Sequence, residues 1–237
     1  MFDDFVNALE ESAPGGILTK DAVRRLYTHI TELLEAGSVM NLTAITSEEE
    51  AARLHTADSL YAAREIGALA IGNAATLIDV GSGGGFPALP IATVIPNVRV
   101  TALDATAKKC AFIAQTAGKC GVNIETLPER AEEASARLRE TFDFATARAV
   151  ARLNILLELC VPFVRVGGYF VAMKGCAAAE ETREAERAAS RLGVTLERAV
   201  GYEIEGGGQR SIIIYKKTSP TPKEYPRRYA QIKKKPL

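Results

Sequence analysis

Short apolar runs and amphipathic stretches alternate along most of this chain, and the two patterns predict different elements. A short run rich in β-branched residues is typical of a buried strand, whereas apolar residues recurring every three or four positions are typical of a helix packed on a core. The predicted strands are 76–80, 98–103, 123–127, 143–147, 168–174, 198–204 and 211–215. The predicted helices are 88–95, 106–119, 131–140, 150–163 and 177–192. Regular alternation of this kind indicates a parallel sheet with helices on both faces.

The last two strands break this alternation because only Glu205-Gly-Gly-Gly208 separates them. So short a connection is typical of a hairpin, which would place one antiparallel strand in the sheet. We therefore expect an α/β, Rossmann-like fold with a mostly parallel seven-stranded sheet and one antiparallel strand. The sheet domain should occupy residues 73–217, between an N-terminal helical extension over 1–72 and a basic C-terminal tail over 218–237.

The N-terminal extension shows helical periodicity. One face of a helix that begins near Thr19 is marked by apolar residues at helical spacing, namely Val23, Leu26, Tyr27, Ile30, Leu33 and Leu34. Gly37 is expected to end this helix. The segment Ser47-Glu-Glu-Glu50 has capping-box spacing and opens a further helix that runs toward Ile66. Residues 67–73 are predicted to form a linker.

A glycine-rich loop follows the first predicted strand. Gly81, Gly83 and Gly85 stand at alternate positions between that strand and an apolar helix. Glycine permits a positive φ in a tight turn and lets a ligand approach the backbone where a Cβ would block it. The loop opens at the carboxyl end of a strand, where open α/β sheets bind their ligands. The alternative is that the three glycines only form a turn.

The residues around this loop narrow the choice of ligand. The loop lacks the Gly-Lys-Ser/Thr ending of a P-loop, and Phe86 stands where a dinucleotide fingerprint requires glycine. The second predicted strand ends at Asp104, an acidic residue about 20 positions past the loop, as expected for a hydrogen bond to ribose hydroxyls. An adenosine site without a pyrophosphate grip predicts S-adenosylmethionine as the cofactor.

Length and composition exclude several classes of protein. The 237 residues, of which 47% are hydrophobic, allow one catalytic-size domain with a modest extension. No run of 18 apolar residues predicts a membrane span, and the start, Met-Phe-Asp-Asp-Phe, does not resemble a signal peptide. Free buried thiols in a cytoplasmic protein are expected, with neither a metal site nor disulfides, because no Cys-x-x-Cys spacing is present. The cysteines are Cys110, Cys120, Cys160 and Cys176.

A net charge of zero conceals an uneven distribution. Residues 216–237 carry eight Lys and Arg against the single acid Glu224, whereas residues 1–75 hold twelve acidic and five basic residues. In the tail, tyrosines alternate with the pair Arg227 and Arg228, a mixture suited to base stacking and phosphate contacts. The tail therefore favours a nucleic-acid partner. The alternative is a solvated, disordered tail that only aids solubility.

A set of short motifs is spread over most of the chain. The N-terminal and central motifs are Asn41-Leu42-Thr43, His55-x-x-Asp58-Ser59, Asp79-Val-Gly81-x-Gly83-x-Gly85-Phe86-Pro87 and Leu103-Asp104 with Lys108-Lys109. The later ones are Arg130-Ala131-Glu132, Ala147-Arg148-Ala149, Lys174-Gly175, Tyr225-Pro226-Arg227-Arg228 and Lys235-Pro236-Leu237. Together they resemble the bacterial 16S ribosomal RNA guanine-N7 methyltransferases once called glucose-inhibited division protein B. Ala88 and Ala105 depart from the glycine and serine usual in that family.

The resemblance implies a class I S-adenosylmethionine-dependent methyltransferase that modifies N7 of a guanine in 16S rRNA, in the 530-loop region of the small subunit. It implies that the cofactor site is lined by Gly81, Phe86, Ala131, Glu132 and Arg148, beside the Gly83, Gly85 and Asp104 discussed above. It also implies that three residues face the RNA or the reacting base, namely Asn41, Arg130 and Lys174. In the tail, Arg227 and Arg228 are the candidate RNA contacts.

The chain lacks the motifs of methyltransferases that act on pyrimidine C5 or on exocyclic amines, which also favours guanine N7 as the acceptor. Methylation at C5 of a pyrimidine needs a cysteine nucleophile, commonly in Pro-Cys, and no cysteine here follows proline. Exocyclic amines commonly use Asn/Asp-Pro-Pro-Tyr/Phe after the fourth strand, where this chain has Thr146-Ala-Arg148-Ala-Val150. Guanine N7 carries a free lone pair and needs alignment at about 3–3.5 Å rather than a general base. No residue is therefore assigned as a catalyst.

Some interpretations stay open. His55 and Asp58 share a helix face and could form a catalytic pair, but a structural hydrogen bond between the N-terminal helices and the sheet domain is favoured. Arg148 could form a surface salt bridge, and Lys174 could be solvated rather than bound to phosphate. The whole protein could be an RNA-binding assembly factor with a vestigial pocket, or a small-molecule methyltransferase. We expect a monomer that acts on 16S rRNA or the small subunit.

Overall fold

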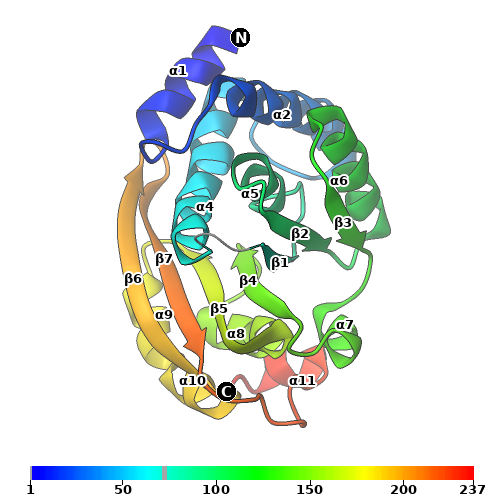
Figure 1. The fold of residues 1–237 in the computed structure, drawn as a ribbon, viewed down its shortest axis with the longest axis vertical. Coiled ribbons are helices and arrows are strands. Elements are labelled where there is room, and N and C mark those ends of the chain that lie inside the picture. Colours follow the sequence, from blue (N-terminus) through cyan, green and yellow to red (C-terminus); the bar gives the residue numbers. More distant parts are fainter. Residues whose placement is uncertain (1, 71–73) are drawn as a thin grey trace.

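The computed structural model describes residues 2–70 and 74–237. Within these ranges seven strands form one sheet in the order β3-β2-β1-β4-β5-β7-β6 (Figure 1). The strands are β1 (Ala75–Val80), β2 (Val98–Leu103), β3 (Ile124–Leu127), β4 (Phe142–Arg148), β5 (Val164–Lys174), β6 (Val194–Ile204) and β7 (Gly208–Lys217). β1 to β5 pair in parallel, whereas β7 is antiparallel to both β5 and β6. The predicted strands, including the final hairpin, are confirmed.

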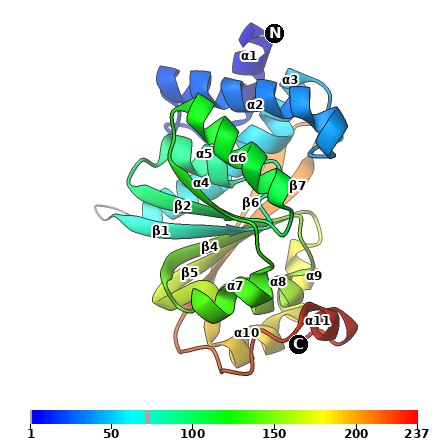
Figure 2. The same cartoon turned by 90° about the vertical axis from the view of Figure 1, so that its right-hand side faces the viewer.

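Helices cover both faces of the sheet (Figure 2). The helices that follow the strands are α5 (Ala88–Val94), α6 (Ala107–Cys120), α7 (Ala131–Arg137), α8 (Leu153–Cys160), α9 (Ala178–Glu184) and α10 (Glu186–Leu192). The helix predicted over 150–163 is shorter at both ends, because Ala149 has a left-handed φ of 55° and the chain tightens into a 3₁₀ turn, η2, at Val161–Phe163. The one predicted over 177–192 is divided at Ala185.

The N-terminal region adds a helical layer over α5 and α6. Its elements are α1 (Phe2–Ser12), α2 (Lys20–Met40), α3 (Glu48–Ala51), the π-helical η1 (Ala52–Ala57) and α4 (Asp58–Leu69). The predicted caps are present: the Thr19 hydroxyl accepts the N–H of Ala22 at 3.1 Å, and that of Ser47 accepts the N–H of Glu50 at 3.2 Å. This layer shares one apolar core with the sheet domain, in which Leu33 and Leu60 pack with Leu77 of β1.

Two predictions about the ends of these helices were wrong. Gly37 does not end α2, which continues to Met40 and is closed by Asn41 at a left-handed φ of 51°. Gly37 is buried, and a Cβ there would lie 3.4 Å from the Thr43 side chain, so packing overrides its weak helix propensity. Likewise α4 runs past Ile66 to Leu69 and takes in part of the predicted linker. The rest of that linker, residues 71–73, lies outside the described residues.

The C-terminal tail is folded against the opposite face of the sheet domain. Its short helix α11 (Tyr229–Lys234) contacts α8 and buries Ile232 completely. Arg139 donates hydrogen bonds to the carbonyls of three tail residues, Thr221, Pro222 and Tyr225. The alternative of a disordered tail is therefore not what the structure shows. Among the described residues, no helix combines the length and apolar character needed to cross a bilayer.

Candidate functional site

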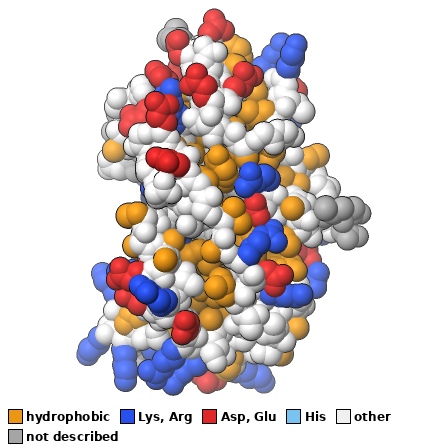
Figure 3. Space-filling view, turned by 90° about the vertical axis from the view of Figure 1, so that its left-hand side faces the viewer, with side chains coloured by type: hydrophobic (Ala, Val, Ile, Leu, Met, Phe, Trp, Pro, Cys, Tyr) orange, Lys and Arg blue, Asp and Glu red, His pale blue; other side chains and the backbone are white. Residues whose placement is uncertain are grey.

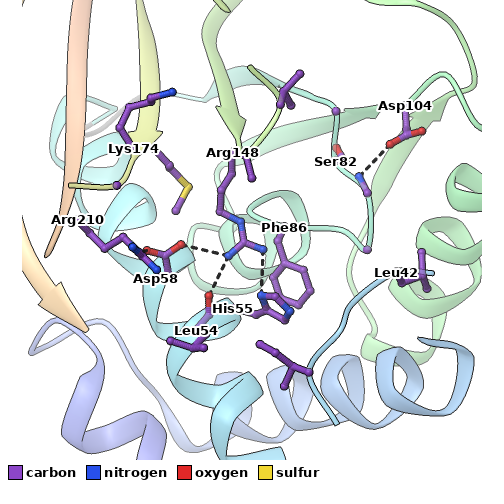
Figure 4. Close-up of a pocket in the computed structure, with 18 of the residues that line it drawn as sticks. Leu42, Leu54, His55, Asp58, Ser82, Phe86, Asp104, Arg148, Lys174 and Arg210 are labelled. Atoms are coloured by element: carbon purple, nitrogen blue, oxygen red, sulfur yellow. Dashed lines mark hydrogen bonds and ion pairs between the residues drawn. The ribbon is translucent and has the colours of Figure 1, made fainter. Parts of the chain in front are cut away.

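A cavity of about 730 Å³ opens at the carboxyl ends of β1, β2, β4 and β5. The glycine loop forms one wall, and the ends of β4 and β5 form another (Figure 4). The N-terminal layer closes a third side with Leu42, Leu54 and His55, while Arg210 reaches in from β7. The parallel sheet thus brings predicted residues from distant parts of the chain to one edge, as its topology requires.

The three glycines of the loop are needed for different reasons. All have positive φ, with values of 80° at Gly81, 55° at Gly83 and 89° at Gly85. A Cβ at Gly81 would lie 2.5 Å from Cγ2 of Val150, and one at Gly85 would lie 2.7 Å from Cδ1 of Leu89. At Gly83 a Cβ would meet only the Gly81 carbonyl oxygen at 4.0 Å. Gly81 and Gly85 are therefore dictated by packing, whereas Gly83 leaves open space on the cavity side.

Asp104 is held in place beside that open space. Its carboxylate accepts the backbone N–H of Gly83 at 3.1 Å through Oδ2 and that of Thr106 at 2.9 Å through Oδ1. The residue is 9% exposed and lines the cavity. Each carboxylate oxygen keeps a lone pair for a further donor. The open cradle at Gly83 and the fixed acceptor at Asp104 fit a ribose and the chain attached to it.

Beneath the loop, Phe86 is stacked between two histidines. Its ring centroid lies 4.3 Å from that of His29 and 4.8 Å from that of His55. His29 Nε2 donates to the carbonyl of Gly84 at 2.8 Å and so ties α2 to the loop. Burial lowers the pKa of His29 to about 4 and that of His55 to about 3, so both rings are neutral at pH 7. The predicted cofactor residue Phe86 is thus a buried floor of the cavity.

Arg148, at the end of β4, joins the sheet to the N-terminal layer. Its Nη1 binds Asp58 Oδ2 and the carbonyl of Leu54, both at 3.1 Å, and its Nη2 lies 3.3 Å from His55 Nδ1. The guanidinium also lies over the Phe86 ring, 5.1 Å from the centroid. The interpretation of His55 and Asp58 as structural partners is confirmed. Arg148 forms a salt bridge, as the alternative held, but with a buried partner at the cavity.

Asp58 also binds two residues that the sequence analysis did not single out. Tyr202 donates its hydroxyl hydrogen bond to Oδ1 at 2.7 Å, and Arg210 Nε lies 3.8 Å from the same oxygen. Both come from the final hairpin, β6–β7. Only the position of Arg210 near the hairpin turn could have suggested from the sequence that it belongs to the site. Its place in the cavity depends on the antiparallel pairing of β7 with β5.

Lys174, at the end of β5, faces the same cavity but is already bound. Its Nζ donates to Glu181 Oε2 at 2.6 Å and to the carbonyl of Ala151 at 2.9 Å. The same Glu181 oxygen accepts the N–H of Leu153 at 2.7 Å, the first residue of α8. Lys174 and Glu181 therefore hold the segment between β4 and α8, which includes Val150 at the cavity wall.

Asp79, the last polar residue of β1, is completely buried below the loop. Its Oδ2 accepts the N–H of Ala88 at 3.2 Å, while Oδ1 has no hydrogen-bond partner among the described residues. Burial is the main cause that raises its pKa to about 7. This carboxyl supports the start of α5 and is not among the groups that line the cavity.

Other predicted site residues lie away from the cavity lining. Arg130, Ala131 and Glu132 begin α7, where Arg130 is exposed and Ala131 is buried. Asn41 is exposed at the end of α2, next to the cavity residue Leu42. In the tail, Arg228 is exposed, whereas Arg227 binds Glu158. The proposed roles of these residues in binding cofactor or RNA stay predictions.

One prediction about the cysteines was wrong. Cys110, Cys120 and Cys160 are buried free thiols as expected, but Cys176 is exposed. It follows β5 in the connection to α9 and lines the cavity with Gly175 and Ala177. Its exposure results from the position of this connection at the open edge of the sheet, which the sequence pattern around the cysteine does not reveal.

Comparison with known proteins decides the family. The model of a family described as rRNA small subunit methyltransferase G matches residues 22–213. The chain belongs to this family. It is 39% identical over 236 residues to the ribosomal RNA small subunit methyltransferase G of Leuconostoc citreum, with 98% of each chain covered. It is also 39% identical over 222 residues to that of Clostridium perfringens strain 13, with 92% of each covered.

Solved structures show the same fold at low identity. An O-methyltransferase from Bacillus cereus in complex with SAH matches with a TM-score of 0.61 at 15% identity, over 92% of this chain and all of that one. A geranyl diphosphate methyltransferase with sinefungin matches with a TM-score of 0.54 at 17% identity, over 70% of this chain and 79% of that one. The fold is that of the Rossmann-like S-adenosylmethionine methyltransferases. As a methyltransferase G family member, the protein is an rRNA methyltransferase that depends on S-adenosylmethionine.

Proposed function

We propose that this protein methylates N7 of a guanine in 16S rRNA, in the 530-loop region of the small subunit. One observation carries the choice of N7: among the described residues around the ends of β4 and β5, the two carboxylates that line the cavity, Asp58 and Glu181, are already paired with Arg148 and Lys174. Arg148, Lys174 and Arg210 are cations, and Asp58 is committed to Arg148 and Tyr202. A ring nitrogen with a free lone pair is an acceptor that such a wall can serve, since no proton must be removed before transfer.

The geometry of the loop supports a role in binding the cofactor. Gly83 provides close approach to the backbone and Asp104 provides acceptors for a ribose, so these residues would hold the adenosine part of S-adenosylmethionine. When bound, this cofactor supplies an electrophilic methyl group on a sulfonium. The residues around the acceptor base then have to hold it in line with that methyl and exclude water, which is positioning rather than acid–base chemistry.

In this proposal Arg148 shapes the cavity wall as an immobilised side chain whose charge is balanced. Its charge is balanced by Asp58, and its position is set by four contacts to Leu54, His55, Asp58 and Phe86. A free cation beside the base would oppose the positive charge that methylated N7 acquires. Pairing with a carboxylate removes much of that repulsion while the guanidinium still shapes the wall.

The exposed residues near the cavity are the proposed RNA contacts. Asn41 precedes Leu42, which lines the cavity on the side of the N-terminal layer, and Arg130 lies at the start of α7, which follows β3. We also propose that Ala131 and Glu132 complete the cofactor site next to Asp104, since β2 and β3 are neighbours in the sheet. A protein of this activity works where ribosomes are assembled, the cytoplasm, and we propose that it acts as a monomer.

The test is methyl transfer to small subunits purified from cells that lack the enzyme. Incubation with labelled S-adenosylmethionine should introduce 7-methylguanosine, identified by mass spectrometry and by chain scission after borohydride and aniline. Gly83→Val serves as the cofactor-site control, because a branched side chain at φ 55° is strained and fills the open cradle. A product methylated only at a 2′-oxygen or an exocyclic amine would refute the proposal. Cofactor binding without any rRNA product would favour an assembly factor instead.

A further inference from the structure

The tail contains two kinds of basic residue, which the structure separates clearly. Arg227 is turned inward and is tied to the protein, whereas Arg228, Lys233, Lys234 and Lys235 are exposed. Among the described residues, none of these four exposed cations forms an ion pair with a carboxylate. A free, exposed group of like charges is unfavourable unless solvent or a partner compensates it.

Arg227 is bound to a completely buried carboxylate. Its Nη2 and Nε donate to Glu158 of α8 at 2.6 and 2.8 Å, and its backbone N–H donates to the same carboxylate at 2.9 Å. Its Nη1 also donates to the carbonyl of Lys235 at 3.1 Å, which closes the tail upon itself. A guanidinium that satisfies a buried acid cannot leave it for a phosphate without exposing an unpaired charge.

Two further contacts make the tail rigid. Lys217 Nζ, itself buried, donates to Thr221 at 2.7 Å and lies 3.0 Å from Glu140. Ile232 is fully buried on the inner side of α11, so Lys233 and Lys234 project from a packed helix and Lys235 follows directly after it. Because the backbone of this segment is fixed before any partner binds, binding need not order the tail itself.

Helix α8 connects the anchor of the tail with the cavity wall. Glu158 follows Leu153 by five positions, roughly 8 Å along α8, and Leu153 adjoins the cavity wall at Val150. Helix α11 contacts α8, and Figure 2 shows it on the side of the molecule toward which β1 and β2 point. Gln231, Lys234 and Lys235 also surround, with Arg227, a shallow hollow of about 390 Å³.

Charge is distributed unevenly between the N-terminal helices and the tail. Residues 1–75 hold twelve acidic against five basic residues, whereas residues 216–237 hold eight basic residues against one acidic residue. On the face drawn in Figure 3, acidic side chains likewise gather at the top, over the N-terminal helices, and Lys and Arg are frequent at the lower end. A polyanion that enters the cavity is therefore repelled by the upper layer and attracted toward the tail. The folded tail is complementary in charge to a phosphate backbone rather than to an acidic or neutral small molecule.

We propose that α11 and its lysines form a preformed docking surface for the rRNA phosphates that flank the target guanine, with Arg227 as its anchor and not as an RNA contact. This inference rests on the proposed function for its substrate. It divides the tail into residues that touch RNA, namely Arg228, Lys233, Lys234 and Lys235, and a pair that holds them in place, Arg227 with Glu158.

The first test removes charge without disturbing the anchor. The variant Lys233→Gln/Lys234→Gln/Lys235→Gln keeps good helix formers and should leave S-adenosylmethionine affinity and the thermal midpoint unchanged. Each lost phosphate contact lowers the slope of log affinity against log salt by about 0.7 for single-stranded RNA, or roughly fourfold in affinity at 0.15 M salt. The full variant should thus bind a target-loop RNA roughly fiftyfold more weakly, with a salt slope reduced by about 2.

A matched control removes the same charge elsewhere. Lys20, Arg24 and Arg99 are exposed, with the first two at the start of α2 and the third at the amino end of β2, opposite the cavity. Changing all three to glutamine should have little effect on RNA affinity. An equal loss in both triple variants, or none in the tail variant, would overturn the docking surface. A loss seen with whole subunits but not with isolated RNA would assign the surface to a ribosomal protein instead.

The second test separates an anchor from a contact. Glu158→Gln removes a buried negative charge, so if Arg227 bound RNA directly, this change would leave RNA affinity equal or higher. If Arg227 is the anchor, both Glu158→Gln and Arg227→Met should release the tail, increase its cleavage by trypsin and weaken RNA binding together. The proposed reaction is tested separately from the docking surface. Tail variants that bind RNA more weakly but still produce 7-methylguanosine support both the docking surface and the proposed reaction. The absence of 7-methylguanosine in the wild type refutes only the reaction.

Discussion

Replacing Lys174 with methionine removes an ammonium while keeping most of the apolar stem. The side chain is 9% exposed and its partner Glu181 is 12% exposed, so the variant leaves a carboxylate nearly buried and unpaired. Loss of one partner of a buried pair costs about 3–5 kcal/mol, and we take about 3 kcal/mol because the pair borders the cavity. The free energy of unfolding, measured by urea denaturation, should fall by about that amount.

The matched change is Glu181→Gln, which keeps an acceptor for the N–H of Leu153 but loses the charge. It should cost on the order of 2 kcal/mol, and the double variant should cost less than the sum because the two groups interact directly. The coupling energy from this double-mutant cycle should be about 1–3 kcal/mol. A value near zero would show that the 2.6 Å contact contributes nothing.

The same variants show whether Lys174 positions the cavity wall or binds an RNA phosphate. If Lys174 acts through the carbonyl of Ala151, loosening of Val150 and its neighbours should lower kcat by about 10- to 100-fold and change the KM for RNA little. If Lys174 binds phosphate, Lys174→Met should instead raise that KM and reduce the salt slope by about 0.7, with Glu181→Gln having the opposite or no effect. The second pattern would refute the positioning role.

Further predictions concern the cofactor site and pH. Gly83→Val should abolish S-adenosylmethionine binding and Asp104→Ala should weaken it by about 1–3 kcal/mol, as measured by calorimetry, and near-wild-type affinity in both would contradict the site. Asp79 has a folded pKa of about 7, above its unfolded value of 3.8, so its contribution to stability is present below about pH 4 and is lost as pH rises toward 7. Asp79→Asn should therefore gain stability over the wild type by up to roughly 4 kcal/mol between pH 4 and pH 8 in parallel denaturation curves; a constant difference would refute the raised pKa. The lowered pKa values of His29 and His55 act in the opposite direction, so wild-type stability should also fall as pH drops below about 6.5. Single-turnover methyl transfer should show little dependence on an enzyme base near neutral pH, and a steep rise with one ionisation would require a proton acceptor.

The order of the strands and helices and the position of the glycine-rich loop could be predicted from local sequence patterns. The spacing of apolar residues reflects which side of a strand or helix is buried, so it can be recognised in the sequence without knowledge of the tertiary structure. The glycines at 81, 83 and 85 and the acid at 104 were likewise identifiable, because a tight turn with positive φ and an acidic residue at the end of the second strand have local signatures. The continuation of α2 through Gly37 was not predictable in this way, because it depends on the burial of that position in the folded protein, which outweighs the weak helix propensity of glycine.

The partners of the charged residues, in contrast, depend on how distant segments of the chain pack together. The sequence suggested Lys174 and Arg227 as RNA contacts and Arg148 as a cofactor residue, yet each is bound to a carboxylate that lies between 7 and 90 positions away. Such partners are brought together only when β4, β5, α8 and the tail pack around one edge of the sheet. Charge and residue type are written in the sequence, but burial and pairing, which determine whether a charge can meet a ligand, depend on long-range contacts that no local pattern encodes.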